Sequence, residues 1–283
     1  MKPYSLGLYE KAMPNWLTLP EKLALAADCG FDRMQISIDE TEAKLARLDY
    51  SARQLRELEC IARDTGVPIG TLCLSAHRRY PFGSHDPATV KKSLEIMEKA
   101  LDFSAAIGVK IIQLAGYDVY YEICDAGTEA RFRENLAKAT QMAASYGILL
   151  GLETMETPFM DTTRKAMDHV EQIGSAFLGV YPDIGNLKNA AVYYGTDVVE
   201  DLRTGRGHIH AVHLKETRPG VYRGMFLGHG GHTEYSRCIE ELWNQGVRMF
   251  TGEFWYLDEG QYEQDIRDAA RFLRDKIDPF VKG

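Results

Sequence analysis

The sequence has no long hydrophobic segment and no excess of basic residues. None of its apolar runs approaches the roughly 18 residues of a membrane-spanning helix. Residues 1–10 also lack the apolar stretch of a signal peptide. We therefore expect a cytoplasmic protein without a membrane partner. The formal net charge of −8 argues against nucleic acid as a partner, because the neutralisation of phosphates requires a basic face.

Paired cysteine motifs are missing as well. The chain has 5 cysteines, an odd number, and no two of them form a Cys-x-x-Cys motif. This arrangement favours reduced and mostly buried thiols, and it excludes an all-thiolate zinc site. A Gly-x-Gly-x-x-Gly motif is also absent after the first apolar segment, which argues against a dinucleotide-binding sheet.

The chain does contain a regular alternation of short apolar segments and longer helical patterns. Eight segments are predicted strands, and most of them have the continuously apolar pattern of strands buried on both faces: residues 4–10, 31–39, 69–76, 109–116, 148–153, 178–183, 209–214 and 248–254. A capping box at Thr18 and Glu21 starts one helix, and Ser84 or Asp86 starts another. Repeated strand–helix units predict an α/β fold with a parallel sheet. Eight such units without a break in composition predict a (β/α)8 TIM barrel, a single domain over residues 1–283, with an open doubly wound sheet as the alternative.

Four side chains of metal-binding type lie at or near the ends of four successive predicted strands. Glu153, Asp183, His213 and Glu253 are separated by 30, 30 and 40 residues. One strand–helix unit of a TIM barrel takes roughly 30 residues, and the C-terminal ends of the strands build its active site. Any one of these acids could simply cap a helix or pair with a lysine, but four at this period indicate a common site. Three carboxylates and one imidazole suit Zn²⁺, Mn²⁺, Mg²⁺ or Co²⁺.

Other polar residues near the strand ends have simpler interpretations. Asp183 precedes Ile-Gly-Asn, a poor helix start, so we do not expect it to act mainly as a helix cap. We expect His85 and His169 to be solvated. His229 and His232 lie in a glycine-rich segment, for which we expect a mobile lid or turn rather than a metal site.

Several motifs of the chain resemble the L-xylulose/L-ribulose 5-phosphate 3-epimerases, which belong to the xylose-isomerase-like TIM barrels. The resemblance runs from residue 6 almost to the C-terminus. Its motifs are Leu-Gly-Leu-Tyr-Glu at 6–10, Ile-Asp-Glu-Thr at 38–41, Leu-Cys-Leu-Ser-Ala-His-Arg-Arg at 72–79, Ile-Gln-Leu-Ala-Gly-Tyr-Asp-Val-Tyr-Tyr at 112–121, Tyr-Pro-Asp-Ile-Gly-Asn-Leu at 181–187 and Ala-Val-His-Leu-Lys at 211–215. The long motifs at 72–79 and 112–121 are the specific ones, since the strand-end acids alone indicate only the broader group.

The resemblance implies a metal site and a reaction. In that family a Glu, an Asp, a His and a second Glu at the ends of strands five to eight bind the metal, and they match Glu153, Asp183, His213 and Glu253 without substitution. The family further implies Zn²⁺ or Mn²⁺, a homodimer, and inversion at C3 of a ketopentose 5-phosphate in pentose and ascorbate degradation.

Epimerisation at C3 needs a proton removed from one face of the carbon and another delivered to the opposite face. Glu153 and Glu253 belong to predicted strands five and eight, which lie roughly across the barrel from each other. We therefore expect these two carboxylates to be the catalytic base and its conjugate acid. Asp183 and His213, which lie between them, are expected mainly to bind the metal.

Substrate binding is expected at basic residues that follow the third and seventh strands. His77 and Arg78 follow the third, and Lys215 and Arg218 follow the seventh. Arginine is suited to bidentate phosphate binding, although Arg78 could instead pair with a surface acid. The competing functions are an aldose–ketose isomerase of a sugar phosphate, similar to the hexulose-6-phosphate isomerases, and a free-ketose 3-epimerase. An apurinic endonuclease would need more histidine ligands and a basic face, and a sugar sensor would bind without turnover.

Overall fold

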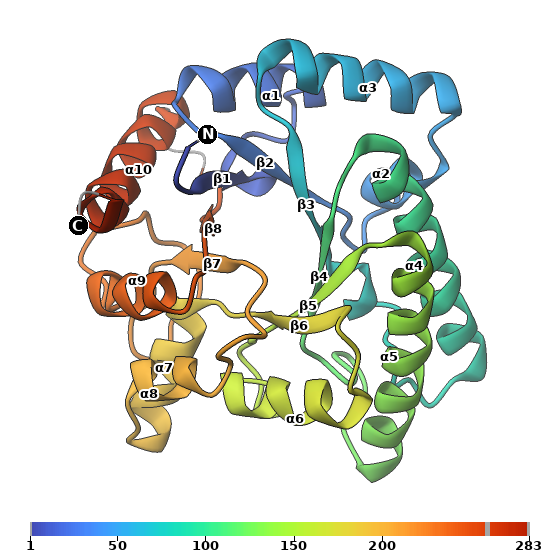
Figure 1. Cartoon of the computed structure of the whole chain (residues 1–283). Coiled ribbons are helices and arrows are strands. Elements are labelled where there is room, and N and C mark those ends of the chain that lie inside the picture. Colours follow the sequence, from blue (N-terminus) through green and yellow to red (C-terminus); the bar gives the residue numbers. More distant parts are fainter. Residues whose placement is uncertain (1, 258–260, 282–283) are drawn as a thin grey trace.

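Eight parallel strands form one barrel that is surrounded by helices (Figure 1). The computed structural model describes residues 2–257 and 261–281. The strands are β1 (Ser5–Tyr9), β2 (Arg33–Ser37), β3 (Ile69–Leu74), β4 (Ile111–Ala115), β5 (Leu149–Glu153), β6 (Leu178–Tyr181), β7 (Val212–Lys215) and β8 (Met249–Glu253). Their order is β6-β5-β4-β3-β2-β1-β8-β7, and parallel bridges from Val180 to Ile209 and from Asp183 to His213 join β6 to β7. The predicted TIM barrel is confirmed, with every predicted strand present.

The helices connect successive strands on the outside of the barrel (Figure 1). They are α1 (Leu19–Asp28), α2 (Glu42–Leu45), α3 (Ala52–Thr65), α4 (Pro87–Ile107), α5 (Ala126–Tyr146), α6 (Thr163–Ile173), α7 (Ile184–Tyr194), α8 (Val198–Arg203), α9 (Tyr235–Asn244) and α10 (Tyr262–Ile277). Short 3₁₀ segments are η1 (Glu10–Ala12), η2 (Ala46–Asp49), η3 (Ser75–Arg78) and η4 (Asp278–Val281). No helix in the described part of the chain has the length and apolar composition that a membrane crossing requires.

Local sequence signals explain where the helices begin and end. Thr18 and Glu21 form the predicted capping box at the start of α1. Asp86, rather than Ser84, is the N-cap of α4, and its carboxylate accepts hydrogen bonds from two backbone N–H groups of the first turn. Gly108 ends α4 with φ at 81°, a left-handed conformation that glycine adopts without the steric cost of a Cβ.

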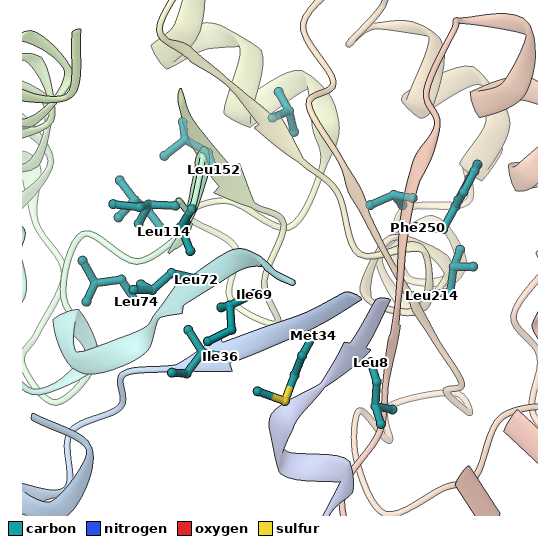
Figure 2. Close-up of a cluster of buried hydrophobic side chains, with 14 of the residues drawn as sticks. Leu8, Met34, Ile36, Ile69, Leu72, Leu74, Leu114, Leu152, Leu214 and Phe250 are labelled. Carbon is teal, nitrogen blue, oxygen red and sulfur yellow. The ribbon is translucent and has the colours of Figure 1, made fainter. Parts of the chain in front are cut away.

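The main hydrophobic core lies between the barrel and its helices. On β2, Met34 and Ile36 are fully buried in this core (Figure 2). Gln35, which lies between them, instead hydrogen-bonds to His213 of β7 across the barrel interior. Because side chains alternate along a strand, each strand presents one set of residues to the helices and the other to the interior. That alternation places the metal-type residues inside the barrel.

Candidate metal centre

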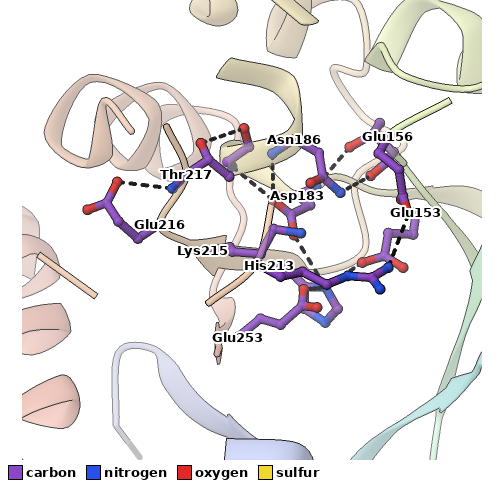
Figure 3. Close-up of polar contacts among 12 residues, drawn as sticks. Glu153, Glu156, Asp183, Asn186, His213, Lys215, Glu216, Thr217 and Glu253 are labelled. Atoms are coloured by element: carbon purple, nitrogen blue, oxygen red, sulfur yellow. Dashed lines mark hydrogen bonds and ion pairs between the residues drawn. The ribbon is translucent and has the colours of Figure 1, made fainter. Parts of the chain in front are cut away.

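Glu153, Asp183, His213 and Glu253 converge inside the C-terminal end of the barrel. Glu153 and Glu253 are the last residues of β5 and β8, His213 lies in β7, and Asp183 directly precedes α7 (Figure 3). All four are buried, and one ligand atom of each lies within 4.8 Å of the others. The predicted grouping of these residues is therefore confirmed, whereas metal binding by each of them stays a prediction.

The contacts within the cluster fit a divalent cation. His213 Nδ1 lies 2.8 Å from Glu153 Oε1 and 2.6 Å from Glu253 Oε2. Lys215 Nζ lies 2.8 Å from Asp183 Oδ2. Asp183 Oδ2 and Glu253 Oε2 are buried without a hydrogen bond of normal geometry among the described residues. Three buried carboxylates that converge with one imidazole nitrogen are an oxygen and nitrogen ligand set that suits a divalent metal ion.

Burial and mutual repulsion strongly shift the protonation of this cluster. Burial raises the pKa of Asp183 to about 7, although the neighbouring Lys215 acts in the opposite direction. Burial also raises the pKa of Glu153. Burial alone would lower the pKa of His213, but Glu253 and Glu153 outweigh that effect and raise this pKa well above its usual value. The cluster therefore retains protons that a bound cation would displace.

Asp183 also caps a helix, a role that the sequence made less favoured at this position. It is the N-cap of α7, and its Oδ1 accepts hydrogen bonds from the backbone N–H groups of Gly185 and Asn186, both at 2.9 Å. The expectation that Ile-Gly-Asn is a poor helix start was wrong, since α7 begins at Ile184, whereas capping is not the only contact that Asp183 makes. Gly185 explains the tight start, since an added Cβ would lie 2.8 Å from the Lys215 carbonyl oxygen. Capping occupies Oδ1 and leaves Oδ2 directed at the cluster.

A cavity of about 100 Å³ opens directly above the cluster. Its lining is Tyr9, Lys11, Cys73, Ser75, Arg78, Ala115, Glu153, Met155, Glu156, Lys215, Tyr222, Arg223, Glu253 and Trp255. Glu153 and Glu253 are part of this lining, whereas Asp183 and His213 are not. Two members of the cluster thus face the space that a substrate would occupy, and two lie behind them.

The four predicted substrate-binding residues divide into two groups. Arg78 and Lys215 line the cavity, and the Arg78 guanidinium lies 4.8 Å from the centre of the Tyr120 ring. His77 is buried behind the cavity, where its Nε2 lies 3.1 Å from the Ser93 carbonyl oxygen. Arg218 is exposed, and its Nε donates to the Gly230 carbonyl oxygen. In this arrangement the cavity lining contains Arg78 and Lys215 but neither His77 nor Arg218.

Other cavity residues were missed by the sequence interpretation. Lys11 directly follows the predicted strand at 4–10 and Trp255 directly follows the one at 248–254, so their strand-end positions were an available signal. Arg223 comes from the middle of the β7–α9 loop, where no periodic pattern marks it. It reaches the cavity by pairing with Glu156 at 3.1 Å, a contact that depends on how two loops fold together.

Histidines outside the cluster also differ in part from expectation. His169 is buried rather than solvated, because its ring packs against those of Phe132 and Phe159 at 5.3 and 5.4 Å. His85 is half exposed and lies near the carboxylates of the β4–α5 loop. His232 lies 3.1 Å from Thr217 Oγ1 through its Nε2, so this member of the glycine-rich segment contacts the β7 end.

Comparison with known proteins agrees with this geometry. A family model described as xylose isomerase-like TIM barrel matches residues 23–276. The L-ribulose-5-phosphate 3-epimerases UlaE of Salmonella paratyphi A and Salmonella typhimurium are each 42% identical over 245 residues, which is 87% of this chain and 84% of theirs. A solved D-psicose 3-epimerase has a TM-score of 0.80 at 17% identity, over 96% of this chain and 99% of that one. A solved L-ribulose 3-epimerase has a TM-score of 0.79 at 18% identity, over 99% and 96%. The chain belongs to the xylose isomerase-like TIM barrel family.

Proposed function

We propose that this protein is an isomerase, an L-ribulose 5-phosphate 3-epimerase that requires a divalent metal ion. The supporting relatives carry that activity in their names and are 42% identical over 87% of the chain. The observation that supports this reaction type is the pair of buried glutamates, Glu153 and Glu253, that line the same cavity from β5 and β8. An aldose–ketose isomerase needs one base, whereas inversion at a single carbon needs groups on two faces.

In the proposed mechanism the two glutamates exchange protons with C3 of the sugar. One carboxylate removes the C3 proton, and the carboxylic acid form of the other delivers a proton to the opposite face of that carbon. The direction of the reaction decides which glutamate is the base. A divalent ion held by Glu153, Asp183, His213 and Glu253 would supply Lewis acidity that makes the C3 proton easier to remove. Each acid–base group contributes on the order of 10²–10⁴ in rate.

The protonation of the metal-free cluster is consistent with this division of roles. Lys215 and His213 hold the pKa of Glu253 below its usual range, although burial acts in the opposite direction. The pKa of Glu153 is raised by burial. Two carboxyl groups whose surroundings shift their pKa values in opposite directions are suited to one acting as base and the other as acid.

We further propose that Arg78 and Lys215 bind the substrate. Arg78 is held over the rings of Tyr117 and Tyr120 at the cavity wall, and its guanidinium can bind phosphate oxygens in bidentate fashion. Lys215 is buried beside Asp183, where its ammonium can bind a sugar oxygen near the metal. For His77 and Arg218, contact with the substrate stays a prediction that would require movement of the segments that contain them.

The remaining properties of the enzyme are proposals drawn from its relatives and its composition. We propose Zn²⁺ or Mn²⁺ as the physiological ion, a homodimer as the assembly, a cytoplasmic location, and one domain over residues 1–283. Exposed aromatic residues at the ends of the barrel loops and of α7, such as Tyr121 at 67% exposure and Tyr193 at 80%, provide apolar surface for a dimer contact.

The reaction is tested by incubating the metal-loaded enzyme with L-ribulose 5-phosphate in D₂O and following the sugar by proton NMR. Deuterium at C3 together with L-xylulose 5-phosphate is expected, with loss of both after chelation and recovery on addition of Mn²⁺ or Zn²⁺. Label at C1 or an aldose product would instead identify an isomerase. Unlabelled substrate after long incubation would refute the substrate assignment.

The two-base mechanism is tested by the variants Glu153→Gln and Glu253→Gln. Each should reduce turnover at least 10²-fold, in line with the usual contribution of about 10²–10⁴ from one acid–base group. Glu57→Gln, an exposed glutamate on α3, is the matched control and should retain full activity. A Glu153→Gln or Glu253→Gln variant with half of the wild-type activity would contradict the mechanism.

A further inference from the structure

Below the metal cluster, the barrel interior contains a chain of polar side chains that the catalytic mechanism does not use. Gln35 Oε1 lies 2.7 Å from His213 Nε2, and Gln35 Nε2 lies 3.3 Å from the Tyr181 hydroxyl. The Tyr181 hydroxyl lies 2.9 Å from Thr251 Oγ1. Arg33 donates to Thr251 Oγ1 at 2.9 Å. These residues come from β2, β6, β7 and β8, so the chain crosses the whole interior.

This row of polar side chains is buried, and glycines on the strands leave the space for it. Gln35 and Tyr181 are both fully buried. A Cβ on Gly151 would lie 2.9 Å from the Tyr181 Cβ, and one on Gly7 would lie 2.5 Å from an Arg33 guanidinium nitrogen. Strand glycines therefore leave the space that these large polar residues occupy. A buried polar group without a partner is costly, so such a chain is stable only when its members are paired.

This row of polar side chains selects the tautomer of the neutral His213 imidazole. A neutral histidine has one N–H donor and one acceptor nitrogen. In the neutral imidazole that a cation would bind, the carbonyl oxygen of Gln35 can accept from Nε2–H of His213, and this leaves the lone pair on Nδ1. Nδ1 is the nitrogen that faces Glu153 and Glu253. The amide of Gln35 is itself held, because its nitrogen donates to Tyr181, so rotation of the amide would break both contacts.

The Tyr181 ring also controls the orientation of the imidazole. Its centre lies 4.8 Å from that of His213 at an interplanar angle of 63°. Its hydroxyl is anchored through Thr251, which in turn accepts from Arg33. Arg33 also donates to the Phe250 carbonyl oxygen at 2.9 Å, so the far end of the chain is tied to the backbone of β8.

We propose that Gln35 is a positioning residue for the metal site: it selects the Nε2–H tautomer of His213 and directs Nδ1 toward the cation, while Tyr181, Thr251 and Arg33 hold Gln35 in place. This inference rests on the proposed metal-dependent function. Partners that orient metal-ligating histidines in this way typically change metal affinity by about 10–100-fold when they are removed. Gln35 contacts neither the cavity nor the reacting atoms, so its effect acts through His213.

A second interior glutamine supports the same principle. Gln113 of β4 donates through its Nε2 to Glu153 Oε2, in the buried interior. Glu153 Oε1 then faces His213 Nδ1. One oxygen of the glutamate is thereby held from below, and the other is directed at the cluster. Gln35 and Gln113 thus orient two neighbouring members of the cluster from inside the barrel.

The test compares four variants in the full-length protein: Gln35→Leu, Gln35→Glu, Tyr181→Phe and Thr71→Val. Zinc affinity is measured by competition with a chelator, and the His213 Nε2–H proton is followed by NMR in zinc-loaded protein with ¹⁵N-labelled histidine. Gln35→Leu should weaken zinc binding about 10–100-fold and abolish the slowly exchanging Nε2–H signal. Gln35→Glu retains an acceptor oxygen and should restore both.

The other two variants separate positioning from packing. Tyr181→Phe preserves the ring on His213 and removes only the hydroxyl that holds Gln35, so it should give a smaller loss of affinity and a faster-exchanging Nε2–H. Thr71→Val, the matched control, removes an interior hydroxyl that contacts Arg33 at 3.4 Å but lies outside the path from Gln35 to His213. It should leave zinc affinity unchanged.

The outcomes distinguish this inference from the proposed function. Wild-type zinc affinity and an unchanged Nε2–H signal in Gln35→Leu would overturn the positioning role while leaving the epimerase assignment intact. A Gln35→Glu variant as weak as Gln35→Leu would also overturn it, because packing alone would then explain the loss. Wild-type protein that binds neither Zn²⁺ nor Mn²⁺ would overturn both. A zinc-dependent effect of Gln35 in a protein without epimerase activity would support the inference and refute the proposed reaction.

Discussion

The buried acid cluster should make the stability of the metal-free protein fall as pH rises. Asp183 has a pKa of about 7 in the folded protein, compared with an ordinary value of 3.8, because of its burial. Burial also raises the pKa of Glu153. The folded state therefore binds more protons than the unfolded state across this range, and stability decreases with pH. The contribution of Asp183 is fully present below about pH 4 and is lost as pH rises through about 7.

The size of the expected stability loss follows from the pKa shift of Asp183. One pKa unit corresponds to about 1.36 kcal/mol, so a rise from 3.8 to about 7 represents a loss on the order of 4 kcal/mol in the free energy of unfolding between pH 4 and 8. At roughly 2–4 °C per kcal/mol for a protein of this size, Tm should fall by on the order of 10 °C. Glu253, whose pKa is lowered, has lost its proton in both states above pH 6 and adds no slope there.

The assay is thermal unfolding at pH 5, 6, 7 and 8, with chelator or with saturating zinc. Tm of the chelated protein should fall across the series, whereas zinc displaces the retained protons and should reduce the fall. Asp183→Asn is the informative variant, because Asn is also a good N-cap and preserves the start of α7 while removing the titrating group. It should flatten most of the slope between pH 5 and 6, whereas His213, whose pKa is raised well above its usual 6.5, still contributes a fall above that range. A chelated wild-type protein with equal Tm at pH 5 and 8, or an Asp183→Asn variant with the full slope, would refute the electrostatic argument.

Three further substitutions test other contacts. Arg78→Ala should raise KM for a sugar phosphate by about 10–100-fold with little change in Tm, since a charge-assisted hydrogen bond contributes about 1.5–3 kcal/mol; an unchanged KM in steady-state kinetics would remove Arg78 from the substrate site. Gly151→Ala should cost about 1–3 kcal/mol through overpacking, because its Cβ would lie 2.9 Å from the Tyr181 Cβ, and urea unfolding would show this cost. Glu10→Gln should destabilise the protein by about 3–5 kcal/mol, because fully buried Glu10 neutralises Lys22 and other cations around it; a loss below 1 kcal/mol would contradict that role.

Much of the fold and the cluster could be predicted because both follow from periodicity. Continuous apolar runs mark strands that are buried on both faces, and a 30-residue spacing marks successive barrel units. Glu153 and Glu253 therefore could be placed at strand ends without any knowledge of packing. The cluster alone indicates only the broader group of xylose-isomerase-like barrels. The motifs at 72–79 and 112–121 restrict the prediction to the 5-phosphate 3-epimerases.

The cavity wall could not be predicted, because it depends on contacts between loops. Arg78 and His77 are adjacent in sequence, yet Arg78 lines the cavity and His77 turns away toward the Ser93 carbonyl. The short 3₁₀ turn η3 sets these opposite directions, and no sequence period reports them. Arg223 likewise enters the cavity through its pairing with Glu156. Long-range pairs of this kind are fixed by tertiary structure alone.

The register of the strands explains why Glu253 lines the cavity while His213 does not. Lys215 pairs with Glu253 in the β7–β8 ladder, and His213 pairs with Thr251. His213 therefore lies one interior level below Glu253, at the level of Thr251, whose hydroxyl belongs to the polar chain. From this depth one nitrogen of the imidazole meets the carboxylates above and the other meets Gln35 at 2.7 Å below. If β7 were shifted by two residues relative to β8, each of its side chains would still point to the same side of the sheet. His213 would then, however, lie at the level of the cavity and away from Gln35. The depth of His213 relative to Glu253 thus depends on strand register, which the residue spacing alone does not specify.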